Sequence, residues 1–155
     1  MKQDMIILDE DKVWARERVA ELQAQILALG PEFYEVFNQS SETWHDNAPF
    51  DALRDRQSVL DAELQRLRLI LRSSLPSVPK QKKGVVGIGS FVDLIDKADK
   101  VRKYQIAGDW TPHAGQEIDG MTKVSIQTPL AQQLLGKKSG EKVQVGRKEY
   151  TLVLS

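Results

Sequence analysis

The sequence predicts an α+β protein in which an N-terminal antiparallel helical hairpin, a coiled coil, precedes a small β-rich domain with one short helix. Apolar residues recur every seven positions across residues 11–40 and 50–72, which is typical of a coiled-coil seam. From Gly84 onward the apolar period changes to two, as in strands. We therefore expect a hairpin over residues 1–75, a linker over 76–83 and a second domain over 84–155.

The first helix of the hairpin has a regular seam. Its apolar positions are Val19, Leu22, Ile26, Leu29, Phe33 and Val36, at alternating spacings of three and four. Gly30 and Pro31 interrupt the helix without shifting this phase. Because proline inside a helix removes a hydrogen bond and costs about 3 kcal/mol, we expect a kink or a short break there.

The second helix repeats the pattern. Its seam positions are Phe50, Leu53, Gln57, Leu60, Leu64, Leu67 and Leu71, and the single polar residue among them is of the kind that fixes helix register at some cost in stability. Asp46 or Asn47 is a candidate N-cap, and Pro49 falls in the first turn, where its missing N–H does no harm. Two helices with matching seams and a short connection form an antiparallel hairpin, here with arms of roughly 40 Å.

The second domain is expected to be mostly antiparallel. The predicted strands cover residues 90–95, 103–107, 123–126, 142–145 and 149–154. A short helix is predicted over residues 129–136, with Thr128 as N-cap, Pro129 at its first position and Gly136 as its stop. The preceding basic run of Lys80, Lys82 and Lys83 suits either a nucleic-acid patch or a solvated linker, and its Pro- and Ser-rich surroundings favour the linker.

Composition excludes several function classes. The 155 residues contain no Cys and only 2 His, which excludes disulfides and thiolate chemistry and argues against zinc. No apolar run approaches the roughly 20 residues that span a bilayer, and the first residues do not resemble a signal peptide, so we expect a cytoplasmic protein. Residues 1–75 carry 9 Lys/Arg and 14 Asp/Glu, whereas residues 76–155 carry 13 and 8. An acidic half joined to a basic half suggests two surfaces with different partners.

The connection between the two predicted helices carries the most informative side chains. Glu42 and Asp46 place two carboxylates at the end of a long arm, where they can reach the active site of another protein. From these residues alone, a hydrated loop with a helix cap is the simpler interpretation.

The C-terminal half resembles the Gre transcript-cleavage factors of bacteria. Residues 89–94, 104–108, 124–137, 140–145 and 150–152 are similar to that family's C-terminal domain, with Thr128 in place of the usual Ser at a helix start that ends in Leu-Gly-Lys. Residues 46–50 are similar to the Glu-Asn-Ala-x-Tyr half of the family's tip motif. The family's first tip acid falls on Thr43, so the carboxylate pair of Glu42 and Asp46 has a spacing of four residues where the family uses three.

The resemblance implies a fold, a partner and a role. It implies an FKBP-like second domain and a monomer that binds RNA polymerase, threads its hairpin through the secondary channel and stimulates cleavage of the nascent RNA 3′ end by the polymerase itself. The residues that match the family's sites are Asp46 and Glu42 as carboxylates sharing a Mg²⁺ with the polymerase, Asn47 and Ala48 as residues that shape the tip, and Thr128, Pro129 and Leu130 as the docking patch.

Three other functions stay open. The altered acid spacing suits a Gre-like channel regulator that inhibits or modulates the polymerase without supporting cleavage. A prolyl isomerase or chaperone needs an aromatic pocket, for which Phe91, Tyr104, Trp110 and Tyr150 are the available residues. A structural hairpin adaptor accounts for the seam but leaves the acidic tip unexplained.

Overall fold

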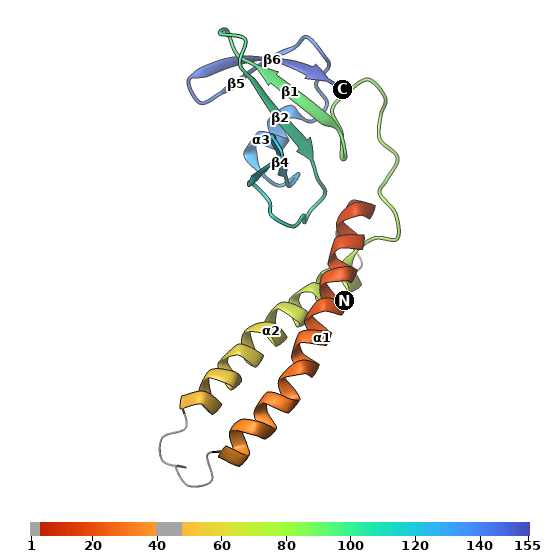
Figure 1. The fold of residues 1–155 in the computed structure, drawn as a ribbon. Coiled ribbons are helices and arrows are strands. Elements are labelled where there is room, and N and C mark those ends of the chain that lie inside the picture. Colours follow the sequence, from red (N-terminus) through yellow and green to blue (C-terminus); the bar gives the residue numbers. More distant parts are fainter. Residues whose placement is uncertain (1–3, 40–47) are drawn as a thin grey trace. The chain divides into compact units, whose positions relative to one another are not determined.

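The computed structural model describes residues 4–39 and 48–155, which form two compact units. The hairpin unit is Val13–Arg72, and the β unit combines residues 4–12 with Ser73–Ser155 (Figure 1). The sequence pattern placed residues 1–12 with the hairpin, whereas in the structure residues 4–12 pack with the second half of the chain.

The hairpin unit consists of most of α1 (Asp9–Gln39) and nearly all of α2 (Ala48–Ser73). The predicted seam is present: Leu22, Leu29, Leu64 and Leu67 are buried, and Val19, Ile26, Phe33, Val36, Phe50, Leu53, Leu60 and Leu71 are half-buried. The ring centroids of Phe33 and Phe50 lie 5.5 Å apart in an edge-to-face pair. Gln57 is exposed, as suits a polar seam residue.

The helix α1 continues through Gly30 and Pro31 as one element, so of the two expectations the short break is absent. Two features explain this continuity. Seam residues Leu29 and Phe33 bury apolar surface on both sides of the proline. Gly30 has no Cβ to clash with the ring that follows it, which removes part of the usual restriction on a residue before proline.

Ion pairs join the two helices of the hairpin along one side. Arg18 donates from Nε and Nη2 to the two carboxylate oxygens of Glu63, at 2.9 and 3.0 Å, and both side chains are about a quarter exposed. Arg56 and Glu32 form a looser and more exposed pair at 3.8 Å. The hydrogen bonds from Arg18 hold the pKa of Glu63 below its ordinary value of 4.5.

The β unit contains a six-stranded mixed sheet in the order β3-β4-β2-β1-β6-β5. The strands are β1 (Phe91–Ile95), β2 (Val101–Ile106), β3 (Glu117–Ile118), β4 (Met121–Val124), β5 (Lys142–Val145) and β6 (Lys148–Leu154). All neighbouring strands are antiparallel except β2 and β4, which pair in parallel. The expected α+β class is confirmed, while the likeness to FKBP domains stays a prediction. The two-residue β3 is too short to leave an alternating pattern in the sequence.

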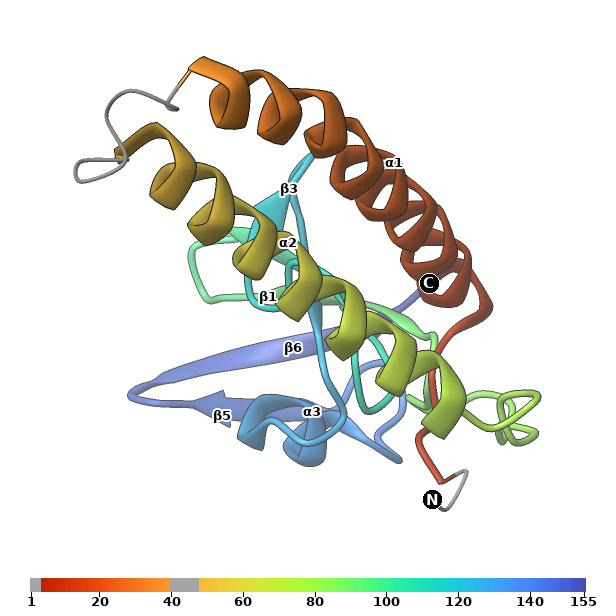
Figure 2. The same ribbon diagram turned by 90° about the horizontal axis from the view of Figure 1, so that it is seen from below.

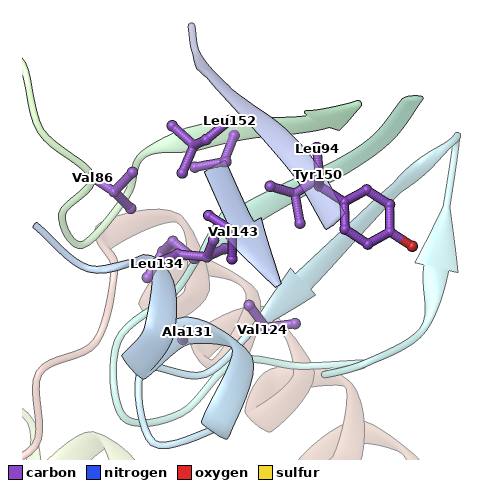
Figure 3. Packing of buried hydrophobic residues seen from close by; sticks show 10 residues of the cluster. Val86, Leu94, Val124, Ala131, Leu134, Val143, Tyr150 and Leu152 are labelled. Atoms are coloured by element: carbon purple, nitrogen blue, oxygen red, sulfur yellow. The ribbon is translucent and has the colours of Figure 1, made fainter. Parts of the chain in front are cut away.

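The short helix α3 (Pro129–Leu134) lies against β5 and completes the core (Figures 2 and 3). Its buried residues Ala131 and Leu134 join Val86, Val92, Leu94, Ile106, Val124, Val143, Tyr150 and Leu152 in one apolar cluster. Thr128 caps the helix, because its Oγ1 accepts from the N–H of Ala131 at 3.2 Å. Gly136 follows with a φ of +81°, a conformation in which glycine has no steric cost. The predicted N-cap and stop are therefore confirmed.

The N-terminal segment is attached to the β unit through its backbone. Met5 donates to the carbonyl of Ser73 at 2.9 Å and accepts from the N–H of Leu75 at 2.8 Å. The carbonyl of Ile6 approaches Gly108 so closely that a Cβ there would lie 2.0 Å from its oxygen. Only glycine fits at position 108, and this close approach allows the N-terminal segment to lie beside the loop after β2.

Replacing Leu64 by Ala is expected to lower the free energy of unfolding of the hairpin by about 2–4 kcal/mol, because this seam side chain is only 5% exposed. Peptide-resolved hydrogen exchange measures the loss of protection in each unit separately. Val59→Ala is the control, since Val59 lies on the same helix and is 68% exposed. An equal loss of protection across residues 84–155 would contradict the expectation that the β unit stays folded when the hairpin is destabilised.

Replacing Glu63 by Gln is expected to destabilise the hairpin by about 1 kcal/mol at pH 7, because the bidentate bond to Arg18 is lost. Because the pKa of Glu63 is lower in the folded protein than in the unfolded chain, its ionised carboxylate stabilises the fold at pH values above the unfolded pKa of 4.5. This stabilisation is lost as the pH falls through the lowered pKa of the folded protein. Urea titrations at several pH values should therefore show the two proteins converging in acid. Glu17→Gln, an exposed change on α1, should show no such convergence.

Candidate functional site

The acidic connection joins the end of α1 at Gln39 to the start of α2 at Ala48. Glu42, Asp46 and Asn47 lie outside the described residues, so their predicted roles stay predictions. Ala48 is the first residue of α2 and is exposed, and Pro49 occupies the first turn as expected. Below the connection, the contact between Phe33 and Phe50 holds the two helices together. The acidic segment is therefore flanked on both sides by helices that pack against each other.

The predicted docking patch lies at the start of α3. The hydroxyl of Thr128 accepts from Ala131 N and donates to the carbonyl of Ser125 at 2.8 Å. Leu130 is half-buried against the core, and Pro129 is exposed. Of the three residues, Pro129 therefore offers the most surface to a partner, while Thr128 and Leu130 fix the shape of the helix start.

The loop before this patch depends on Asp109, which the sequence did not single out. Its Oδ2 accepts from the N–H of Ile6 at 2.6 Å, and its Oδ1 accepts from Nε2 of Gln127 at 3.0 Å. The carbonyl of the same residue accepts from the hydroxyl of Ser125 at 3.2 Å. Asp109 thus links the N-terminal segment to the loop that leads into the docking patch. A Gly-Asp pair directly after a strand was the available signal, and it is too common to identify this role.

A buried ion pair fixes the first turn of α1 to β4. The Nζ of Lys123 lies 2.6 Å from Asp11 Oδ1 and 3.4 Å from Glu10 Oε2. The Asp11 side chain is 3% exposed, and this burial raises its pKa although the hydrogen bond from Lys123 acts in the opposite direction. Both residues belong to the β unit, so this contact orders the segment in which α1 begins.

Two of the four aromatic candidates for a proline pocket, Tyr150 and Phe91, differ strongly in exposure. Tyr150 is buried in the core at 3% exposure, beneath the guanidinium of Arg102, whereas Phe91 is 46% exposed. Two cavities of about 310 and 280 Å³ in the β unit are lined mainly by charged and polar residues. These surroundings do not favour the isomerase interpretation.

Within residues 4–39 and 48–155, no three Asp, Glu or His side chains come together as a possible metal site. In the same residues, no helix has the length and hydropathy required to cross a membrane.

Comparisons with known proteins place the chain in a family. The family model described as transcription elongation factor GreA/GreB, C-terminal, matches residues 80–154. Transcription elongation factor GreA of Metamycoplasma arthritidis is 34% identical over 119 residues, which cover 74% of this chain and 69% of that protein. GreA of Paracoccus denitrificans is 28% identical over 113 residues, covering 70% and 69%.

A solved structure, that of Thermus aquaticus Gfh1, aligns with 98% of this chain and 96% of its own at 16% identity and a TM-score of 0.44. The match over the β unit and the similarity to GreA along more than two thirds of both chains lead to one conclusion. This chain is a member of the GreA/GreB family of transcription elongation factors.

Proposed function

We propose that this chain binds bacterial RNA polymerase and stimulates cleavage of backtracked RNA, with Asp46 and Glu42 as the assisting carboxylates. The observation that carries the proposal is the position of this pair in a GreA/GreB family member. Both carboxylates fall in the segment that connects α1 to α2, at the end of a paired helical hairpin. The protein itself is an elongation factor, and the hydrolysis belongs to the polymerase.

The donor chemistry of this pair suits Mg²⁺. Carboxylate oxygens are the hard ligands that Mg²⁺ prefers, and this ion commonly binds through one or two carboxylates together with substrate phosphates. Such an ion, shared with the polymerase, supplies charge neutralisation at the phosphate and lowers the pKa of a bound water. An incomplete ligand set in this chain is consistent with a site that is completed by the polymerase.

The remaining residues position this pair. The seam of buried leucines makes the hairpin a stiff support. The proposal gives Asn47 and Ala48 the role of shaping the tip. Docking is assigned to the start of α3 through Pro129 and Leu130. The hydroxyl of Thr128 already makes two hydrogen bonds within the protein, so its contribution to docking is the shape of the helix start.

A second function has one observation in its favour. Glu42 and Asp46 are four residues apart, one more than the spacing expected for the family's tip. A displaced carboxylate suits a channel-binding regulator that inhibits or modulates the polymerase without supporting cleavage. The two functions share the docking surface and differ only in what the tip carboxylates do.

Asp46→Asn should abolish stimulated RNA cleavage and leave polymerase binding near normal, because it removes one charged oxygen donor without changing the size of the side chain. Glu42→Gln should weaken cleavage, with partial rescue by excess Mg²⁺ through mass action. The assay follows labelled RNA in stalled elongation complexes, with binding measured in the same reaction. Asp51→Asn, in the first turn of α2, is the matched control. If the unmodified protein binds but supports no cleavage at any Mg²⁺ concentration, the regulator is the correct function.

Pro129→Glu should weaken polymerase binding roughly tenfold, about 1.4 kcal/mol, because it places a charge on the exposed part of the docking patch. Stability should change little, since an acidic residue is favourable in the first turn of a helix. Lys138→Gln, beyond the end of α3, alters the net charge by the same amount and should bind normally. Normal binding by the Pro129 variant would place the docking surface elsewhere.

A further inference from the structure

One exposed face of α1 carries no charged side chain between residues 20 and 38. Its positions lie one, four and five residues after the seam residues Val19, Ile26 and Phe33, which places them within about 100° of arc around the helix. All nine are exposed, and we call them the outer face of α1: Ala20, Gln23, Ala24, Leu27, Gly30, Pro31, Tyr34, Phe37 and Asn38.

The corresponding face of α2 has a different composition. Its positions lie one, four and five residues after Phe50, Gln57 and Leu64, and five of these nine residues are charged: Asp51, Arg54, Asp55, Asp61 and Arg68. A helix face that points to water normally carries charged and polar residues. The absence of charge from the outer face of α1, in a chain with 28% charged residues, therefore indicates a surface suited to an apolar contact.

The three largest apolar side chains of this face are also the most exposed ones of their kind among the described residues. Leu27 is 80% exposed, Tyr34 72% and Phe37 69%. Beside Leu27, a groove of about 350 Å³ reaches the seam residue Leu64. A Cβ added to Gly30, which lines this groove, would point into open space. The face thus combines protruding side chains with a hole that could receive one.

The outer face also repeats with the spacing of a coiled-coil seam. Six of its residues alternate at spacings of three and four, as the residues of the intramolecular seam do: Ala20, Gln23, Leu27, Gly30, Tyr34 and Phe37. Such a pattern on a second side of a helix is what a second helix partner requires. The contacts between two identical helices related by a twofold axis are reciprocal, so one surface can serve as both partners.

In an antiparallel pair, one register engages all six residues. It places Leu27 opposite Gly30 of the second copy, Phe37 opposite Ala20, and Tyr34 opposite Gln23. Every layer then joins a large side chain with a small or polar one, the arrangement in which a knob enters a hole. The Tyr34 hydroxyl and the Gln23 amide can in addition exchange a hydrogen bond.

We propose that the outer face of α1 binds the same face of a second copy of this chain as an antiparallel helix pair. Leu27 is the central knob, and the groove beside Gly30 is its hole. Nucleic acid and strongly charged protein surfaces do not match a face without charge. A second copy is favoured over another apolar partner because its own residues complete every layer.

The proposal is independent of RNA cleavage, since it concerns the side of the hairpin and not its acidic connection. The family resemblance implies a monomer, so the pair is an assembly that this chain's own residues would add. Neither the docking patch at the start of α3 nor the carboxylates Glu42 and Asp46 take part in it.

Sedimentation velocity of the full-length protein at increasing concentration measures the association. Leu27→Gln should weaken it at least tenfold, because the central apolar contact is lost. Val59→Gln is the matched control, since Val59 is an aliphatic residue with 68% exposure on α2, away from the outer face of α1. Both positions are exposed, so both variants should fold, and circular dichroism checks this.

Disulfide formation between copies tests the register. The chain contains no Cys, so Gln23→Cys and Tyr34→Cys each introduce a single thiol. A disulfide requires Cα atoms within about 7 Å of each other. Because Gln23 of one copy lies opposite Tyr34 of the other, a mixture of the two variants should form a linked dimer faster than either variant alone.

The expected result is an association that Leu27→Gln weakens and Val59→Gln does not, together with preferential linking in the mixture. A monomer at every concentration, or equal weakening by the two substitutions, would overturn the proposal. Faster linking within one Cys variant than in the mixture would also overturn it, because that outcome requires a parallel pair or a different register.

Discussion

The ion pair between Asp11 and Lys123 is the contact on which the arrangement of the N-terminal segment depends. At 2.6 Å and with the carboxylate almost fully buried, it holds the first turn of α1 against β4. Removing one partner of such a pair typically costs 3–5 kcal/mol, because the other charge is left buried. Around it, Lys12 Nζ donates to the carbonyls of Leu75 and Pro76, and Met5 forms an isolated parallel bridge with Ser74. The residues that precede and follow the hairpin are therefore held by the same unit.

The residues that stabilise the protein are mostly different from those that are exposed to a partner. The leucines of the seam and the apolar cluster under α3 are buried and have no surface to present. Pro129 is exposed and contributes little to packing. Thr128 belongs to both groups, since its hydroxyl stabilises α3 and thereby determines how the following proline is displayed. A surface built in this way can change in sequence with little effect on the fold that supports it.

The sequence predicted the elements well because their signals are local. Heptad spacing located both helices, alternation located five strands to within two residues, and Thr128 with Pro129 located the start of α3. The features that it did not predict depend on distant contacts. The pairing of β4 with β2 is parallel, the bond from Ile6 to Asp109 spans 103 positions, and residues 4–12 join the β unit. For α1, the proline suggested an interruption that seam packing and the preceding glycine make unnecessary. Of the candidate site residues, the start of α3 was predicted in structural detail, whereas Asp109 was not.

The position of Ile6 beside Gly108 and Asp109 has a consequence for folding during synthesis. Ile6 leaves the ribosome about a hundred positions before its partner Asp109, so at 5–20 residues per second it waits roughly 5–20 s for that partner. The hairpin contains only nearby partners and can form during that interval. Closing a loop of this length costs entropy before any contact compensates for it, so attachment of the N-terminal segment should be among the last steps of folding. A segment that is made before the hairpin would thus be completed after it.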